Sequence, residues 1–86
     1  MKQFDYLIKD PMGIHARPAG MLAKAAKDFP GTVITIGKGG ATVKASQLMK
    51  LMGLGIKFGD IVTVTAEGQA EDHAIAAMKK LLEENL

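Results

Sequence analysis

Residues 32–44 read TVITIGKGGATVK, a pattern that is typical of a β-hairpin. Residues 32–36 are all threonine, valine or isoleucine, which strands favour because branched side chains pack well on a pleated surface. Residues 37–40 place one lysine among glycines and predict a flexible turn, after which residues 41–44 return as a second strand. We therefore expect an antiparallel sheet in this fold.

The chain before this hairpin predicts a strand and a helix. Residues 3–9 alternate in polarity, which is the period of a half-buried strand. Residues 16–28 are rich in alanine and carry Pro18 in the first turn, where the missing N–H of proline is tolerated. The sequence Phe-Pro-Gly at residues 29–31 ends this helix.

The chain after the hairpin predicts two more helices and one more strand. Residues 46–52 have the apolar spacing of about two helical turns, with Ser46 as the N-cap. Residues 61–65 are all β-branched, which predicts a strand. Residues 70–84 carry the apolar stripe of an amphipathic helix. The order β-α-β-β-α-β-α, with every strand able to pair antiparallel, predicts an α+β fold of two layers with the helices on one face.

Composition excludes several classes of site and partner. The chain has 86 residues, no cysteine and only two histidines, so disulfides, thiolate metal sites and closed multi-histidine zinc sites are excluded. The net charge is +2, and the charged residues are scattered along the chain. The sequence lacks the basic stripe or the stacking aromatics of a nucleic-acid binder. No apolar run could insert in a membrane, and no signal peptide is visible. We expect one domain over residues 1–86, a cytoplasmic location, and no deep active site.

The stretch most informative about function is Gly-Ile-His-Ala-Arg-Pro at residues 13–18. It places His15 where a loop meets a helix N-terminus, whose unpaired N–H groups at Ala16 and Arg17 favour an anion such as phosphate. The guanidinium of Arg17 adds a bidentate phosphate donor. Gly13 allows the sharp turn before the helix, and Pro18 presets its first turn.

This environment suits an imidazole that accepts a phosphoryl group. The positive helix end and Arg17 disfavour the imidazolium form of His15, and they stabilise the negative charge that a phosphoryl group would bring. The residues alone leave an alternative open, because a lone histidine near a helix start is more often a cap or a solvated loop residue.

Residues 13–18 resemble the phosphorylation-site signature of HPr, the histidine-containing phosphocarrier of the bacterial phosphoenolpyruvate:sugar phosphotransferase system. Residues 48–55, which read LMKLMGLG, resemble the apolar second helix of that family and the Leu-Gly that follows it. The resemblance in length, element order and motif position covers essentially the whole chain.

The resemblance implies a fold and a role. The fold would be an open-faced sandwich, with a four-stranded antiparallel sheet and three helices on one side. His15 would accept a phosphoryl group on Nδ1 from phosphorylated enzyme I and pass it to the A domain of a sugar-specific enzyme II permease. Arg17 would stabilise that group. We expect a monomeric carrier rather than an enzyme, without a metal or cofactor.

Partners are expected to dock on the first two helices, where adaptable methionines and nearby lysines would meet apolar surfaces with acidic rims. The candidate docking residues are Met21, Lys24, Lys27, Leu48, Met49 and Met52. The alternative is ordinary core packing, which we expect for Leu51 and at least one of the methionines. For the lysines, the alternative is a solvated helix face.

Two neighbouring residues compete for the position of a regulatory phosphorylation site. In many Gram-positive members of the family, a kinase phosphorylates a serine at the start of the second helix. Counting forward from His15 puts Ser46 at that position, whereas counting back from Leu54 puts Gln47 there. An extra residue in the glycine-rich turn favours Gln47, which leaves Ser46 as the helix N-cap.

A second functional class shares the expected fold. A regulatory module of the nitrogen branch or of catabolite control would bind a transcription factor or an enzyme without turning over phosphate. The intact pair of His15 and Arg17 argues against this reading.

Overall fold

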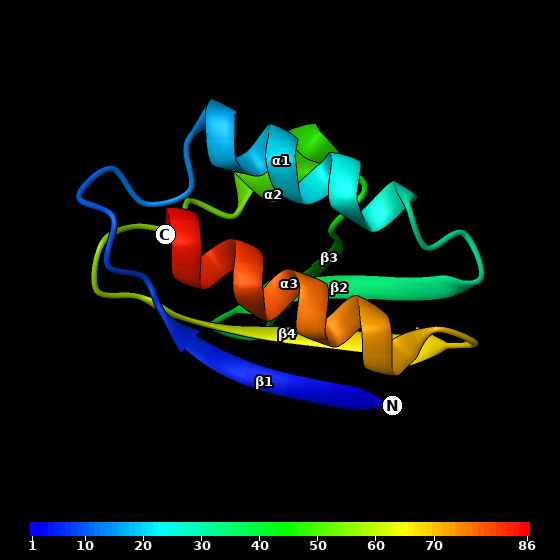
Figure 1. Cartoon of the computed structure of the whole chain (residues 1–86). Coiled ribbons are helices and arrows are strands. Elements are labelled where there is room, and N and C mark those ends of the chain that lie inside the picture. Colours follow the sequence, from blue (N-terminus) through cyan, green and yellow to red (C-terminus); the bar gives the residue numbers. More distant parts are fainter.

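The computed structural model describes residues 1–86 and has seven helices and strands in the expected order, β-α-β-β-α-β-α. Three helices lie on one side of a single sheet, as Figure 1 shows. The elements are β1 (Lys2–Leu7), α1 (Ala16–Lys27), β2 (Thr32–Lys38), β3 (Ala41–Lys44), α2 (Leu48–Gly53), β4 (Ile61–Gly68) and α3 (Glu71–Asn85). The predicted α+β open-faced sandwich is therefore confirmed.

The sheet has the strand order β1-β4-β2-β3, and every neighbouring pair is antiparallel. Its register aligns Phe4, Val64, Ile36 and Val43 across the four strands. Because side chains alternate between the two faces of a strand, this apolar row lies on one face. That face packs against the helices.

The turn between β2 and β3 is shorter than the sequence indicated. Gly37 and Lys38 continue β2, and only Gly39 and Gly40 form the turn. Both have positive φ, 56° and 90°, as tight hairpin turns require. The extra strand length places the side chain of Lys38 beside the segment that follows α2.

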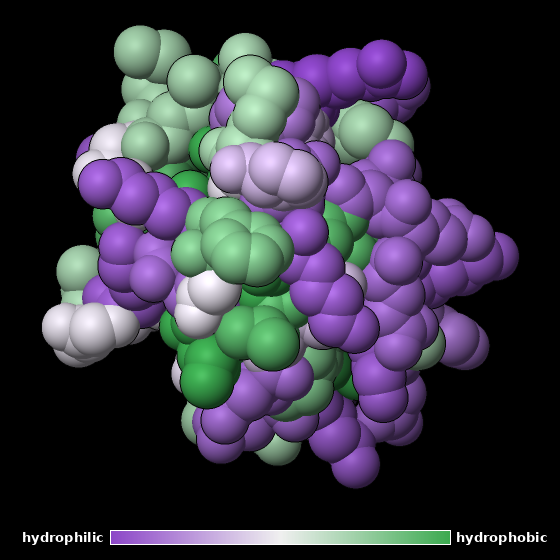
Figure 2. Space-filling model, turned by 90° about the vertical axis from the view of Figure 1, so that its left-hand side faces the viewer, coloured by the Kyte–Doolittle hydropathy of each residue, from purple (hydrophilic) through white to green (hydrophobic).

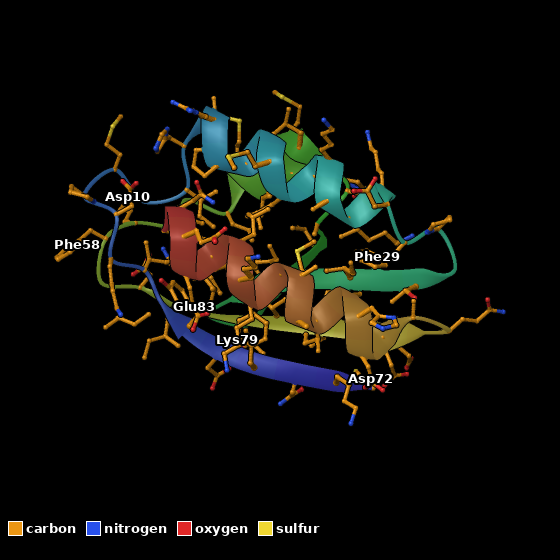
Figure 3. All side chains as sticks on the ribbon, in the orientation of Figure 1. Asp10, Phe29, Phe58, Asp72, Lys79 and Glu83 are labelled. Carbon is orange, nitrogen blue, oxygen red and sulfur yellow. The ribbon has the colours of Figure 1, made fainter.

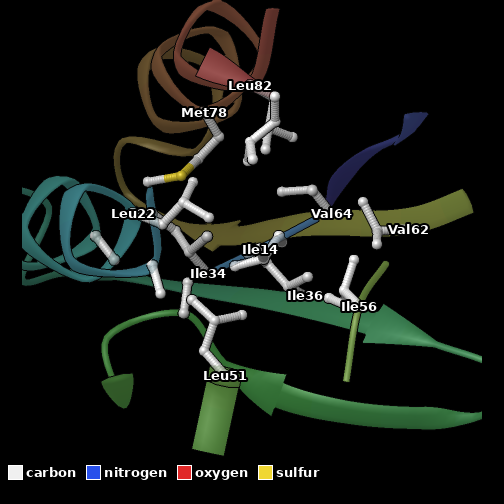
Figure 4. Close-up of a cluster of buried hydrophobic side chains, with 14 of the residues drawn as sticks. Ile14, Leu22, Ile34, Ile36, Leu51, Ile56, Val62, Val64, Met78 and Leu82 are labelled. Atoms are coloured by element: carbon white, nitrogen blue, oxygen red, sulfur yellow. The ribbon is translucent and has the colours of Figure 1, made fainter. Parts of the chain in front are cut away.

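A single apolar core fills the space between the sheet and the helices (Figure 4). The most completely buried large side chains come from all three helices, from β2 and β4, and from the segment after β1: Ile8, Leu22, Ile36, Leu51, Val62, Val64, Met78 and Leu82. The prediction that Leu51 lies in the core is confirmed. No helix has the length and hydropathy needed to cross a membrane.

The predicted N-cap of the short second helix is wrong. The helix α2 begins at Leu48, and its N-cap is Gln47 rather than Ser46. The reason is that Ala45 still belongs to the hairpin: it is fully buried, and its N–H donates to the carbonyl of Ile34 at 2.8 Å. Ser46 consequently lies in the turn before the helix.

Candidate functional site

His15 is the residue from which helix α1 starts. Its backbone is extended, with φ −97° and ψ −175°, and its carbonyl accepts the N–H of Ala19 at 3.0 Å. Its side chain makes no capping hydrogen bond and is 33% exposed. The imidazole is therefore accessible from solvent, and the alternative of a side-chain cap does not hold.

The first turn of α1 offers donors that have no partner in the protein. The N–H groups of Ala16 and Arg17 donate to no protein acceptor, and Pro18 has no N–H. Arg17 is exposed and forms no ion pair with a carboxylate. Backbone donors, a guanidinium and the positive helix end together favour an anion beside His15.

A shallow hollow of about 300 Å³ opens at this point. It brings together residues that the sequence predicted and residues that it did not, namely Asp10, His15, Arg17, Pro18, Met21, Glu84 and Asn85. The last two come from the end of α3, about as far from His15 along the chain as possible. No local motif marks them, because their position depends on how α3 crosses the sheet.

Asp10 is the carboxylate nearest to the imidazole. Its Oδ2 lies 3.9 Å from Nε2 of His15, which is too long for a hydrogen bond but short enough for electrostatic attraction. Its Oδ1 accepts the N–H of Met12 at 2.8 Å, which holds the carboxylate in place. Asp10 thus faces Nε2, and Nδ1 has no contact with a protein carboxylate.

The loop before His15 is held from two sides. The carbonyl of Leu86 accepts the N–H groups of Lys9 at 2.6 Å and Asp10 at 2.9 Å. Figure 3 shows Asp10 near this end of α3. On the other side, the N–H of Ile14 donates to the carbonyl of Ile56 at 3.1 Å. The turn at Gly13 requires its positive φ of 65°, as the sequence indicated.

The candidate docking residues lie on two adjacent helices, α1 and α2. Met49 is 79% exposed, and Leu48 and Met52 are also exposed, as are the two candidate lysines of α1. Met21 is half-buried at the hollow. None of these methionines is fully buried, so the expectation that one of them is core is wrong.

The end of the molecule that carries His15 also exposes apolar side chains that the sequence did not single out. Figure 2 looks onto this end, and green side chains gather in the middle of the face among purple ones. The exposed apolar residues here are Leu7, Met12, Phe58 and Ile61. The hollow therefore lies beside a mixed apolar and polar surface.

Two carboxylates outside the hollow have lowered pKa values. The Lys38 ammonium donates to Asp60 and holds the pKa of that carboxyl below its ordinary value, with help from the N–H of Lys57. The amino group of Met1 lowers the pKa of Glu71 in the same way, with help from the N–H of Gly68. No cluster of three or more metal-binding side chains is present.

Comparison with known proteins places the chain among phosphocarriers. The family model described as "PTS HPr component phosphorylation site" matches residues 2–84. The chain belongs to the HPr family. It is 42% identical over 85 residues to the phosphocarrier protein HPr of Mycoplasma genitalium, covering 99% of this chain and 97% of that one.

Solved HPr structures agree with the fold. A Mycoplasma histidine-containing phosphocarrier protein has a TM-score of 0.92 and 36% identity, covering 96% of this chain and 93% of its own. HPr from Thermoanaerobacter tengcongensis has a TM-score of 0.91 and 37% identity, covering 98% of this chain and 93% of its own. The resemblance read from residues 13–18 and 48–55 is thereby confirmed, and the chain is an HPr phosphocarrier of the phosphotransferase system.

Proposed function

We propose that His15 accepts a phosphoryl group from phosphorylated enzyme I and passes it to the A domains of sugar-specific enzyme II permeases. The chain would thereby serve phosphoenolpyruvate-dependent sugar uptake as a carrier, without being an enzyme itself. One observation carries the proposal: the partly exposed imidazole of His15 stands beside the unpaired N–H groups of Ala16 and Arg17.

Each transfer is a substitution at phosphorus. The lone pair of Nδ1 of His15 forms the N–P bond while the bond between phosphorus and the donor breaks, and its electron pair leaves with the donor group. Onward transfer reverses these roles, with a nucleophile of the acceptor attacking phosphorus and the imidazole leaving. Asp10 supports Nδ1 as the acceptor, because its carboxylate favours the proton on Nε2.

The positive groups at the start of α1 stabilise the charge that arrives. The guanidinium of Arg17 and the two free N–H groups lie beside His15 and can donate hydrogen bonds to the phosphoryl oxygens. The hollow is shallow and open, so it suits a group that two successive partners must reach. The partners supply the remaining catalytic groups.

Docking would use the exposed side chains of α1 and α2. Met49, Met52 and Leu48 offer an adaptable apolar surface, Met21 joins it to the hollow, and Lys24 and Lys27 add positive charge. Regulation at Ser46 stays a prediction. The structure gives Gln47 the N-cap position of α2, which favours Gln47 as the equivalent of the regulatory serine.

Phosphorylation by enzyme I tests the proposal. With phosphoenolpyruvate and enzyme I, the protein should gain one acid-labile phosphoryl group, measured by intact mass. His15→Ala should abolish this gain, and Arg17→Ala should slow it by about 10- to 100-fold. His73→Ala is the matched control, because His73 is exposed in the first turn of α3 and should have no effect.

Two outcomes would count against the proposal. Labelling that persists in His15→Ala would show that another residue is the acceptor. Labelling of His15 without onward transfer to any enzyme II A domain would favour the regulatory module instead.

A further inference from the structure

We infer that Lys38 and Asp60 act as a clamp that positions His15 for phosphoryl transfer, although neither residue touches the imidazole. The inference rests on the proposed role of His15 as the phosphoryl acceptor. The two residues act through residues 55–60, called here the support loop, which lie between α2 and β4.

The clamp binds the support loop on both sides of Ile56. The ammonium of Lys38 lies 2.7 Å from Oδ2 of Asp60 and donates to the carbonyl of Gly55 at 2.9 Å. The same Oδ2 accepts the N–H of Lys57 at 2.8 Å. One ion pair therefore fixes the residue before Ile56 and the residue after it.

Ile56 in turn holds the two residues that precede His15. Its carbonyl accepts the N–H of Ile14 at 3.1 Å. Gly13 packs so closely against it that an added Cβ would lie 2.3 Å from this carbonyl oxygen. Any displacement of Ile56 is therefore passed to Gly13 and Ile14, and from them to the backbone of His15.

Backbone bonds to Ile8 hold the far end of the support loop. The carbonyl of Asp60 accepts the N–H of Ile8 at 2.9 Å, and the N–H of Gly59 donates to the carbonyl of Ile8 at 2.9 Å. Both bonds tie residues 59 and 60 to Ile8, the residue that follows β1. At the other end, the side chain of Ile56 is buried in the core. The backbone of Gly55 has one long bond, 3.3 Å to Met52, besides the one it accepts from Lys38.

The position of the ion pair argues for positioning rather than for bulk stability. The side chains of Lys38 and Asp60 are 31% and 29% exposed, and ion pairs with this access to water contribute little to folding. Phosphoryl transfer is more sensitive, because small misplacements of a reacting group lower rates strongly. Loss of the clamp should thus affect transfer more than folding.

The variant Lys38→Met tests this inference, with Lys38→Arg as the conservative variant. Phosphorylation by enzyme I should lose about 3- to 10-fold in kcat with little change in KM. Hydrogen exchange at the amide of Ile14 should become faster relative to a core amide such as Val64. Lys38→Arg should restore both values, because a guanidinium keeps the charge and can still donate.

Matched variants isolate the clamp. Lys44→Met removes an exposed lysine of the same hairpin that forms no ion pair, and it should change neither kcat nor exchange at Ile14. Asp60→Asn keeps an oxygen for the N–H of Lys57 but removes the charge. It should act in the same direction as Lys38→Met, with a smaller effect.

The results separate this inference from the proposed function. Unchanged kcat and unchanged Ile14 exchange in Lys38→Met would overturn the clamp while His15 remains the acceptor. A uniform rise in exchange at all amides, or a change confined to KM, would also overturn it. If the unaltered protein is not labelled on His15, the proposed function fails, whereas Ile14 exchange alone would still show whether the clamp holds the loop.

Discussion

Gly13 occupies the backbone position at which a side chain is least tolerated near the site. Its φ is 65°, and an added Cβ would lie 2.3 Å from the carbonyl oxygen of Ile56 and 2.7 Å from Cα of Lys57. A backbone atom cannot swing away as the tip of a flexible side chain can. The loop before His15 would therefore have to move.

The variant Gly13→Ala should lower the free energy of unfolding by about 1–3 kcal/mol, measured by urea denaturation, because it adds strain at a positive φ and a backbone clash. Phosphorylation by enzyme I should also become slower. Gly20→Ala is the matched control: Gly20 lies in α1 with no atom within 4 Å of an added Cβ. The free energy of unfolding of this control should rise by about 0.5–1 kcal/mol, because alanine has the higher helix propensity. Equal effects of the two variants would show that the backbone clash at Gly13 is not the cause of the loss.

At the scale of elements, the six-residue helix α2 has one buried side and one exposed side. Leu51 is fully buried against the core, whereas Met49 is 79% exposed on the opposite side of the same helix. A helix this short has little intrinsic stability, so Leu51 anchors it to the sheet.

Two substitutions on this helix should give opposite results. Leu51→Ala should cost about 2–5 kcal/mol in the free energy of unfolding, because it leaves a cavity in the core. Met49→Ser should change stability by less than about 0.5 kcal/mol, but it should raise KM for phosphorylation by enzyme I. Thermal unfolding and transfer kinetics on both variants check this, and an unchanged KM in Met49→Ser would remove Met49 from the docking surface.

The sequence predicted the type of every element, because each has its own local pattern. Boundaries were less predictable where a tertiary contact decides them. Ser46 has the chemistry of an N-cap, but Ala45 is drawn into the hairpin by the carbonyl of Ile34, and the helix begins after Gln47. Gly37 and Lys38 look like turn residues, but pairing with Thr42 and Ala41 keeps them in β2.

Only the part of the candidate site that lies in residues 13–18 could be predicted from the sequence. His15, Arg17 and Pro18 lie in one short motif, whose meaning depends on the start of a helix. Glu84 and Asn85 reach the hollow because α3 runs back over the sheet, and the support loop reaches Gly13 through a backbone bond. Such contacts join segments far apart in the chain, and no spacing in the sequence records them.

For the whole molecule, the two lowered carboxyl pKa values link folding to pH. Lys38 holds the pKa of Asp60 below its ordinary value of 3.8, and the amino group of Met1 holds that of Glu71 below 4.5. The unfolded chain loses these partners, so it binds protons more readily than the folded one. The stabilisation is present above the ordinary values and is lost as the pH falls through the lowered ones.

Unfolding free energies measured in urea should therefore decrease on acidification from about pH 5 to about pH 3. Lys38→Met removes the larger cause of the shift at Asp60, so its stability should depend less on pH over this range than that of the unaltered protein. Lys44→Met should keep the original dependence. High salt should flatten the curve of the unaltered protein towards that of Lys38→Met, because it screens exposed charges. Parallel curves for Lys38→Met and the unaltered protein would show that the ion pair does not contribute to acid sensitivity.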